Sequence, residues 1–383
     1  MKPKFKNSFT SIIEKENTIL LVLEDDCLEI DDPDKEFKLL IKHLDGLQTL
    51  AEIASELNST EGDVLEVIMD LNEYGLIEDC SHSEQSNLTS QEKERYRSNL
   101  NYFNNFSYLQ KSKYSFQETL KNSTVTVLGL GGSSTILSCL AGMGVGNIIG
   151  LDFDEIELSN LNRQFLYNEG NIGSLKTTIT KEELNKMNSN INVQVYNQKV
   201  TSAHKLSDIV KGSQLIINSI DQPSILSTRW VNFAAVKHNI PLLQGGTGGK
   251  KLLLQRFMVN RSGCFDCYLI QILKDNPDFE DELRLIYGAK LEGRNTAFAP
   301  NVAYLAGLLS NEAANILCNF IQKEDFSITT EYSSLSLEKA ATSKWHKINN
   351  CPTCSHIGLD RVEPVELDNL ISIAKEEERS LQI

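Results

Sequence analysis

The sequence has no long apolar run and no recognisable export signal. No stretch approaches the roughly 20 consecutive apolar residues that cross a membrane, and the first residues, MKPKFKNSFTSIIEKENT, lack the apolar core of a signal peptide. In a chain of 383 residues without such a signal, eight cysteines favour reduced thiols over disulfides. These features predict a cytoplasmic protein without a membrane partner.

Positive charge is scarce in the first 90 residues. They contain 7 Lys and no Arg against 21 Asp and Glu, a net charge of −14 out of the −15 of the whole chain. Because an acidic surface repels phosphate backbones, this charge argues against a nucleic-acid partner. The length and the 40% hydrophobic content allow two or three domains, each with its own core.

A glycine-rich turn follows the first strongly apolar run of the larger part of the chain. Thr124–Leu128 predicts a strand, the turn holds Gly129, Gly131 and Gly132, and Ser134–Met143 predicts a helix. Such a turn exposes backbone N–H groups at a helix N-terminus, where phosphate binds. Taken alone, the turn is also explained as a tight connection.

A second predicted strand, Asn147–Asp152, ends in an acid 21 positions after Gly131. That distance suits a carboxylate on a ribose hydroxyl in a βαβ nucleotide-binding fold, although Ser134 stands where that motif has its third glycine. Further polar residues follow at Asp154, Asn160, Arg163, Gln164, Lys176 and Asp221. Lys and Arg neutralise phosphate charge, and an acid at a strand end can hold Mg²⁺, so the set favours a triphosphate over a dinucleotide. Each residue alone is also explained as a solvated loop charge.

The motifs GLGGSS, LDFDEIELSNLNRQFL, IGSLK and NSIDQP resemble the ubiquitin-activating-like (MoeB/ThiF/HesA) adenylyltransferase family, and most of all its MccB-type peptide-modifying members. The resemblance covers about Glu94 to Cys354. It implies an α/β fold with a Rossmann-like, mostly parallel sheet, ATP and Mg²⁺ as cofactors, and a homodimer.

The resemblance also implies roles for the polar set. Asp152 would hold the ribose, Asn160 and Arg163 would contact phosphates, Lys176 would contact the β and γ phosphates, and Asp221 would carry Mg²⁺. Asp154 would assist at the metal or at the attacking group. The remaining ATP-binding residues would be Gly129, Gly131, Gly132 and Gln164.

Two C-x-x-C pairs lie far apart in the chain. Cys264 and Cys267 form the first pair, and Cys351 and Cys354 form the second. Two such pairs typically make a closed, structural Zn²⁺ site with four thiolates. A redox pair, or His356 in place of one cysteine, would be the alternatives.

The N-terminal part has the pattern of a small winged helix. Thr18–Ile30 predicts a hairpin, and helices are predicted at Lys35–Leu47, Thr49–Leu57 and Thr60–Tyr74, the last stopped by Gly75. The pattern resembles the PqqD-like leader-peptide recognition domain, which implies a ribosomal precursor peptide as partner. A plain interaction or dimerisation module is the alternative.

By that resemblance, a peptide would add as a strand beside Leu20–Leu23, with the helix Asp63–Leu71 as the other wall. The acidic charge favours a leader that carries Lys or Arg. The polar stretch Cys80–Ser90 predicts a linker, and a capping box at Thr89–Glu92 predicts the start of the next helix.

The family has an R-Y-x-R helix that sends an arginine into the ATP site of the partner subunit. Here the expected position is Ser98. The arginine acting in trans is therefore either Arg97 or Arg95, or it is absent.

After Lys176 the pattern alternates between strands and helices. Strands are predicted at Asn192–Val200, Gln214–Asp221 and Pro241–Gly245, with helices at His204–Gly212 and Ser224–Asn239. Such alternation indicates a parallel sheet covered on both faces, and Asp221 then lies at a strand's carboxyl end, where such sheets bind ligands.

The glycines at 245–249 predict a flexible turn. Residues 270–300 predict a mobile loop across the active site, with Arg294 as a substrate contact or a solvated charge, followed by a helix at Asn301–Phe320. No cysteine occurs from Tyr268 to Leu317, where the ubiquitin-activating branch carries its thioester cysteine. The tail predicts a solvated helical end.

We therefore expect an ATP-dependent enzyme that adenylates or phosphorylates a carboxylate or amide of a precursor peptide. The expected domains are a winged-helix-like domain (1–80), a linker and helix (81–112), an adenylation domain with zinc knuckles (113–356) and a tail (357–383). The alternatives are an adenylyltransferase for a ubiquitin-like sulfur carrier, a non-catalytic leader-binding partner of a cyclodehydratase, and an NAD-dependent oxidoreductase.

Overall fold

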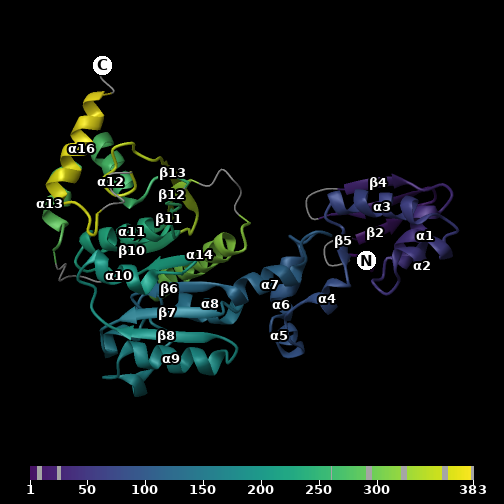
Figure 1. Cartoon of the computed structure of the whole chain (residues 1–383), viewed down its shortest axis with the longest axis horizontal. Helices are drawn as coiled ribbons and strands as arrows, with labels where there is room; N and C mark the ends of the chain where they lie inside the picture. The colour runs from purple at the N-terminus through teal and green to yellow at the C-terminus, as the bar shows by residue number, and fades with distance from the viewer. Residues whose placement is uncertain are drawn as a thin grey trace. The chain divides into compact units, whose positions relative to one another are not determined.

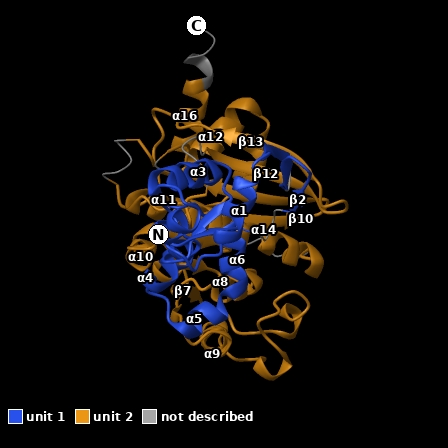
Figure 2. Ribbon diagram, turned by 90° about the vertical axis from the view of Figure 1, so that its right-hand side faces the viewer, with its two compact units in different colours: residues 1–119 blue, residues 120–383 orange. Residues whose placement is uncertain are grey.

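The strands and helices of the chain separate into two groups along the sequence (Figure 1). The computed structural model describes residues 1–6, 11–23, 27–259, 261–289, 296–320, 326–355 and 361–380. Two compact units are formed, one by residues 1–119 and one by residues 120–383 (Figure 2). Each unit has its own apolar core.

Short strands and helices make up most of the first unit. The strands are β1 (Pro3–Phe5), β2 (Ser11–Glu14), β3 (Thr18–Val22), β4 (Cys27–Asp31) and β5 (Ile77–Asp79). The helices are α1 (Glu36–His43), α2 (Leu50–Glu56), α3 (Glu61–Glu73), α4 (His82–Gln85), α5 (Ser90–Arg95) and α6 (Arg97–Asn104). The predicted hairpin and three helices are thus present, although the hairpin turn at Glu24–Asp26 lies outside the described residues.

The sheet order corrects one expectation about the peptide groove. β2, β3 and β4 form an antiparallel sheet in that order, so β3 is bonded on both sides. The predicted docking strand, Leu20–Leu23, therefore belongs mainly to the central strand. Among the described residues, β2 and β4 are the edges of this sheet, and only an edge strand has backbone groups free for an added peptide.

Local capping and apolar burial explain why the first unit folds this way. Thr49, Thr60 and Thr89 each accept a hydrogen bond from the backbone of the third helical residue, which completes a capping box at α2, α3 and α5. The core gathers buried apolar side chains from both sheets and from α1, α2 and α3, among them Leu21 and Ile68.

A buried lysine joins the start of the chain to the end of α6. The Nζ atom of Lys6 donates to the carbonyl oxygens of Asn104 at 3.0 Å and Ser107 at 2.7 Å, and the residue is 4% exposed. Burial lowers the pKa of Lys6 to about 8, with Glu78 opposing and Lys113 reinforcing the decrease.

The second unit is built on an eight-stranded sheet with the order β13-β12-β11-β10-β9-β6-β7-β8. The strands are β6 (Thr124–Leu128), β7 (Asn147–Asp152), β8 (Asn192–Asn197), β9 (Leu215–Asn218), β10 (Leu242–Gly248), β11 (Lys251–Phe257), β12 (Ser327–Ser333) and β13 (Lys339–Trp345). Strands β6 to β10 pair in parallel, and β10 to β13 pair antiparallel. The predicted mostly parallel sheet is confirmed.

Helices cover both faces of this sheet (Figure 1). The helices of this unit are α8 (Ser134–Met143), α9 (Lys176–Met187), α10 (Ala203–Val210), α11 (Leu226–His238), α12 (Phe265–Asp275), α13 (Phe279–Ile286), α14 (Ala299–Leu317) and α16 (Leu367–Ser380), while α7 (Lys113–Asn122) runs across the boundary between the two units. Helices α8, α9 and α14 pack together on one face, and α10, α11 and α12 pack on the other. No helix among the described residues is long and apolar enough to span a membrane.

Two predicted loops are regular structure. The glycines from Gly245 to Gly248 lie in strand β10. A Cβ atom at Gly245 would lie too close to the carbonyl oxygen of Leu253 and to Leu305 and Leu309 of α14. Glycine there lets α14 pack closely on the strand. The predicted mobile loop at 270–300 is helical over most of its first part, as α12 and α13.

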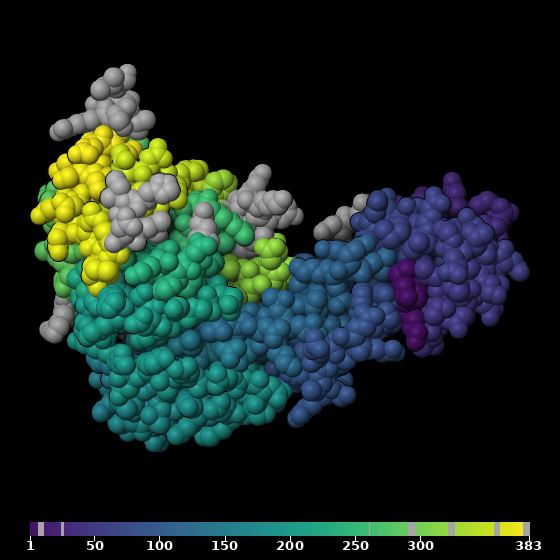
Figure 3. Space-filling model, viewed as in Figure 1, coloured from purple at the N-terminus to yellow at the C-terminus, as the bar shows by residue number. Residues whose placement is uncertain are grey.

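The predicted solvated end is also wrong in part. The helix exists as α16, but Leu370, Ile371 and Ala374 are buried in the main core of the second unit. The space-filling view shows this C-terminal segment lying on the surface of the unit (Figure 3). Its apolar residues recur at helical spacing, so one face is buried while the charged face remains in solvent.

Candidate active site

The carboxyl ends of three neighbouring parallel strands bring the predicted site residues to one edge of the sheet. Leu128 of β6 pairs with Leu151 of β7 and with Asn218 of β9. The chain continues from these residues into the glycine loop, Asp152 and the segment that carries Asp221. Ligands bind at this edge in open α/β sheets.

Asp152 fixes the glycine loop to the end of β7. Its Oδ2 atom accepts a hydrogen bond from the backbone N–H of Leu130 at 2.7 Å, and its Oδ1 atom accepts from the N–H groups of Phe153 and Asp154 at 2.8 and 2.9 Å. The side chain is buried. Since each carboxylate oxygen has two lone pairs, Oδ2 can accept one more hydrogen bond, such as one from a ribose hydroxyl.

Lys176 is connected to Asp152 by way of Asp154, whose backbone N–H donates to Asp152 and whose carboxylate pairs with the lysine. The Nζ atom of Lys176 lies 2.9 Å from Oδ2 of Asp154, and the backbone N–H of Lys176 donates to the carbonyl oxygen of Asp154. The lysine side chain is 7% exposed and the aspartate 47%. The ammonium group of Lys176 is therefore buried, while the carboxylate of Asp154 that pairs with it is partly exposed to solvent.

Two of the three loop glycines, Gly129 and Gly131, lie where a side chain would be crowded. Gly129 has a φ of +85°, and a Cβ atom there would lie 2.8 Å from the carbonyl oxygen of Ser219. A Cβ atom at Gly131 would lie 2.7 Å from Nε2 of Gln164. The loop is thus pressed between the end of β9 and the segment after β7.

Buried polar atoms at this loop test whether the site suits a nucleotide. Ser134 Oγ and Thr135 Oγ1 at the start of α8, together with Gln164 Oε1, are buried without a hydrogen-bond partner among the described residues. Such atoms are costly unless a ligand or water satisfies them. Hydroxyl groups at a helix N-terminus fit phosphate oxygens, so the donor set of the loop fits ATP.

Asn160 and Arg163 lie in the segment that follows β7. The Oδ1 atom of Asn160 accepts from the N–H of Glu157 at 3.2 Å, and the asparagine is buried. Arg163 is half-buried, and its guanidinium donates to the carbonyl oxygen of Ser159 and to Asn162 Oδ1. Its bonds are thus to neighbouring loop atoms.

Asp221 is exposed beyond the end of β9. The turn before it is tied to the glycine loop, since the hydroxyl groups of Ser219 and Ser133 lie 2.6 Å apart. The turn after it is tied to residues beyond α13: the Ser224 N–H donates to the carbonyl oxygen of Ala289, and the Gly288 N–H donates to that of Ser224.

A cavity of about 610 Å³ opens at the end of β8. Its lining residues are Gln198, Lys199, His204, Lys205, Asp208 and Ile209. The N–H of Gln198 donates to the carbonyl oxygen of Asp152 at 3.1 Å, and Lys199 Nζ lies 5.1 Å from the ring centre of Phe153. The cavity therefore adjoins the acid that ends β7.

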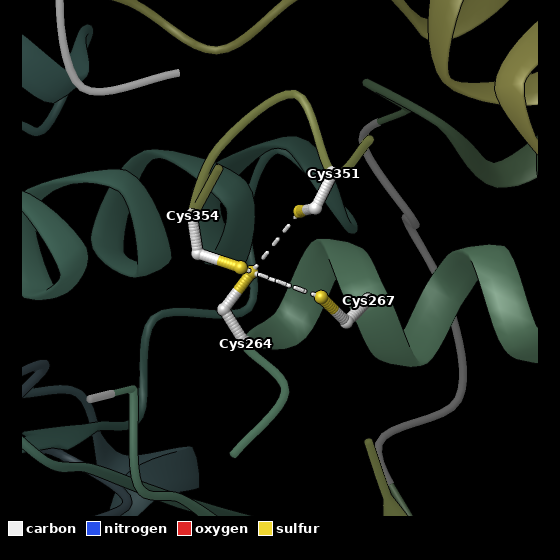
Figure 4. Close-up of side chains that lie close together, drawn as sticks. All are labelled: Cys264, Cys267, Cys351 and Cys354. Carbon is white, nitrogen blue, oxygen red and sulfur yellow. Dashed lines mark hydrogen bonds between the residues drawn. The ribbon is translucent and has the colours of Figure 1, made fainter. Parts of the chain in front are cut away.

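The four predicted cysteine ligands come together in the core. Cys264, Cys267, Cys351 and Cys354 are buried, and their Sγ atoms all lie within 4.8 Å of one another. The close-up shows the four thiols turned toward a common centre, from the start of α12 and from the loop before α16 (Figure 4). The Sγ–Sγ distances of 3.4, 3.6 and 4.0 Å match the roughly 3.8 Å of a tetrahedron with Zn–S bonds of about 2.3 Å.

Four predicted residues are not part of this site as the structure describes it. Arg294 and His356 lie outside the described residues. Arg97 belongs to the first unit, where it pairs with Glu94 at 3.4 Å on an exposed surface, and Arg95 is exposed nearby.

Ser219, Asp266 and Arg229 were not predicted as site residues. Ser219 lies inside the NSIDQP motif, so its closeness to Asp221 was a usable signal. Asp266 is the charged residue inside the first C-x-x-C pair, and its burial indicates a partner. The partner, Arg229, is 37 residues away and left no local signal.

The fold is that of an open α/β domain with polar residues at the carboxyl ends of its parallel strands and a four-cysteine cluster that could hold a metal ion. The ThiF family model matches residues 97–355, which is more than half of the chain. The chain therefore belongs to the ThiF family.

Known proteins resemble the chain over different lengths. It is 31% identical to SUMO-activating enzyme subunit 2 of Dictyostelium discoideum over 158 residues, which are 41% of this chain and 24% of that protein. It is 28% identical to the sulfur carrier protein ThiS adenylyltransferase of Escherichia coli over 255 residues, 64% of this chain and 91% of that protein. The match thus spans about a quarter of the first relative and most of the second.

A solved structure matches almost the whole chain. E. coli MccB, crystallised with AMPCPP and MccA, superposes with a TM-score of 0.70 and 20% identity, covering 93% of this chain and 100% of that one. At this identity the match establishes a shared fold, which includes the first unit as well as the sheet.

Proposed function

We propose that this chain is an ATP-dependent adenylyltransferase that activates a carboxylate or amide of a ribosomally made precursor peptide. The observation that carries the proposal is the buried Lys176, paired with Asp154 and joined through Asp152 to the amide of Leu130 in the glycine loop. Backbone amides, a cation and strand-end acids at one edge complement a triphosphate and its metal. Membership of the ThiF family supports adenylyl transfer, and the fold shared with MccB supports a peptide substrate.

In this proposal each part of ATP has its own partner. The free lone pair of Asp152 Oδ2 would accept from a ribose hydroxyl, and the cavity beside Gln198 would receive the base. The loop amides and the hydroxyl groups of Ser134 and Thr135 would bind phosphate oxygens. Mg²⁺ held by Asp221 would neutralise phosphate charge.

The reaction would begin with an oxygen of the peptide attacking the α-phosphorus. As the new P–O bond forms, the bond from this phosphorus to the oxygen that bridges to the β-phosphorus breaks, and pyrophosphate leaves with the bonding electron pair. Lys176 and Arg163 would stabilise the charge that develops on the leaving group. A γ-phosphoryl transfer would instead release ADP, and product analysis separates the two.

The first unit would bind the leader of the peptide. Its sheet has two edges among the described residues, and α3 presents Leu65 and Met69 at a spacing of one helical turn, with 37% and 39% of their surfaces exposed. An extended peptide could add to the edge at β4 and bury these side chains. The net charge of −14 in residues 1–90 favours a leader rich in Lys or Arg. A homodimer, with Arg97 or Arg95 acting in trans, is part of the proposal.

A second candidate is adenylation of a small sulfur-carrier protein. The observation in its favour is the similarity to the ThiS adenylyltransferase over 91% of that protein. The absence of cysteine between Tyr268 and Leu317 disfavours a product held as a thioester in that region. If the peptide is the substrate, a carrier that ends in Gly-Gly should fail to stimulate pyrophosphate exchange.

Mass spectrometry with pyrophosphate exchange tests the proposal. The full chain is incubated with MgATP and each candidate precursor peptide, with a synthetic Gly-Gly-tailed carrier in parallel. We expect peptide-dependent exchange of labelled pyrophosphate into ATP, and a peptide that gains a nucleotidyl group or loses water. Exchange that depends on the carrier alone would establish the second candidate, and no exchange with any partner would refute adenylation.

A further inference from the structure

One fully buried arginine lies between the candidate metal site and the segment that carries Asp221. Arg229 on α11 is 0% exposed. Its Nε and NH2 atoms donate to the two carboxylate oxygens of Asp266 at 2.9 and 3.1 Å, and its NH1 atom donates to the hydroxyl of Tyr287 at 2.8 Å. This fork-to-fork pairing is geometrically specific, because a lysine cannot reproduce it.

Asp266 ties this arginine to both cysteine pairs. It stands between Cys264 and Cys267 and is 0% exposed. Its Oδ2 atom also accepts from the hydroxyl of Thr353 at 2.6 Å, and Thr353 stands between Cys351 and Cys354. The Oδ2 atom of Asp266, in the first C-x-x-C pair, therefore accepts hydrogen bonds both from Arg229 and from Thr353 in the second pair.

A second hydrogen bond connects α11 to the first C-x-x-C pair, Cys264–Cys267. The backbone N–H of Phe265, which follows Cys264, donates to Oδ1 of Asn232 at 2.9 Å, and Asn232 is also 0% exposed. Arg229 and Asn232 are three residues apart on α11 and thus face the same side. One face of this helix is therefore hydrogen-bonded to the two residues that stand between Cys264 and Cys267.

The other end of the connection lies at the candidate active site. Helix α11 begins at Leu226, so the turn from Asp221 leads directly into it. Tyr287, the second partner residue of Arg229, directly follows α13, and the next residues, Gly288 and Ala289, exchange backbone hydrogen bonds with Ser224. Both sides of the turn after Asp221 are therefore held by elements that Arg229 joins.

We infer that Arg229 is a positioning residue that couples the four-cysteine metal site to the Asp221 turn. The metal would hold the two C-x-x-C pairs together, and the residues inside these pairs would fix the position of Asp266. Through its bonds to Asp266 and Tyr287, Arg229 would then fix the positions of α11 and of the end of α13. The meaning of this coupling for catalysis rests on the proposed function, whereas the coupling itself does not. Residues that hydrogen-bond to metal ligands typically change metal affinity by roughly 10–100-fold when altered, and Arg229 acts one step further out, through Asp266.

Hydrogen exchange on the full chain tests the coupling without any assay of ATP. The metal-loaded protein and the protein treated with a zinc chelator are compared in peptides that cover residues 220–229 and, as control, residues 147–152 of β7. We expect amide exchange in 220–229 to increase at least about tenfold on metal removal, with β7 changed less than about twofold. Unchanged exchange in 220–229, or an equal increase in both peptides, would overturn the inference.

Substitution of the arginine gives the second test. Arg229→Lys keeps a positive charge but loses the fork, and Arg256→Lys is the matched control, because Arg256 is also a buried partner of a carboxylate, that of Glu312. We expect Arg229→Lys to release zinc at least about tenfold faster to a chromophoric chelator and the control to stay within about twofold. The Mg²⁺ concentration for half-maximal ATP binding should rise in the same variant only.

The readouts separate failure of this inference from failure of the proposed function. A chain that binds no ATP but shows the expected exchange and zinc-release changes keeps the coupling and loses the proposed function. Zinc release from Arg229→Lys at a rate within twofold of the unsubstituted protein overturns the coupling. If the chain binds ATP, faster zinc release from this variant together with an unchanged Mg²⁺ concentration for half-maximal ATP binding also overturns it. If Arg229→Lys does not fold, the exchange comparison on the unsubstituted protein decides.

Discussion

Lys176 Nζ lies 2.9 Å from Asp154 Oδ2, across 22 residues of sequence and next to the carboxylate that organises the glycine loop. The lysine is buried and the aspartate is half exposed. A buried ammonium group needs a partner, and a carboxylate at the surface can yield that role to phosphate oxygens when they arrive. The pair therefore presents a cation that is positioned before the substrate binds.

Replacing Lys176 by Met should reduce ATP-dependent pyrophosphate exchange by roughly 10²–10³-fold, because a preorganised cation at the leaving group is lost. The fold should be little affected, since the remaining Asp154 is half exposed and such a pair contributes at most about 1 kcal/mol. Lys181→Met, on the exposed face of the same helix, is the control. Equal exchange rates in the two variants would refute the role of Lys176.

Gly129→Ala should destabilise the second unit by at least about 2 kcal/mol. The left-handed backbone costs an L-residue roughly 1–2 kcal/mol, and the added Cβ atom would collide with the carbonyl of Ser219. Gly132→Ala should stay within about 0.5 kcal/mol, since its nearest neighbour would be Ser219 Cβ at 3.8 Å. Urea denaturation of both variants measures the difference, and similar losses would contradict the loop geometry.

Stability of the first unit should increase with pH through the titration of Lys6. Burial lowers the pKa of Lys6 from 10.5 to about 8, with Glu78 and Lys113 as the charged neighbours that shift it. Between these values the unfolded chain binds more protons than the folded one, so the unfolding free energy rises with pH. Below about pH 8 the burial penalty is fully present.

The size of this effect can be measured against Lys6→Met, which cannot titrate. The unfolding free energy of the unsubstituted chain minus that of the variant should increase by on the order of 2 kcal/mol from pH 7.5 to 9.5. Urea denaturation of the full chain at several pH values gives both numbers. A difference that stays constant or decreases with pH would show that Lys6 is not held in a desolvated site.

One zinc ion per chain should be found by metal analysis, and Cys351→Ser should lose most of it. Because the four cysteines belong to the main core of the second unit, loss of the metal should lower the unfolding free energy by several kcal/mol. Cys27→Ser, at an exposed position in the first unit, should keep the metal. Full zinc occupancy in Cys351→Ser would rule out the four-thiolate site.

Much of the second unit could be predicted because its signals are local. The alternation from Thr124 to Gly248 fixed strands and helices, and the carboxyl-edge rule then placed Asp152 and Asp221 beside the glycine turn. Cysteine spacing predicted the cluster in the same way. Each strand, turn and C-x-x-C pair is set by residues within a few positions of one another, and general rules of sheet and metal-site architecture then bring the distant ones together.

The failures have a common physical origin in long-range packing. The glycines after Gln244 read as a turn, but they form a strand on which Leu305 and Leu309 of α14 pack. The apolar face of α16 was hidden by its charged residues, and the pairing of Arg229 with Asp266 joins positions 37 residues apart. In each case the deciding partner lies outside the local pattern.

A structure of the full chain with Mg²⁺ and AMPCPP tests the central claim most directly. The account predicts the triphosphate against the amides of Gly129–Gly132, the ribose on Asp152, Lys176 turned to the β and γ phosphates, and the metal at Asp221. Nucleotide bound at any other place, or at this edge without contact to Lys176 and Asp221, would contradict it.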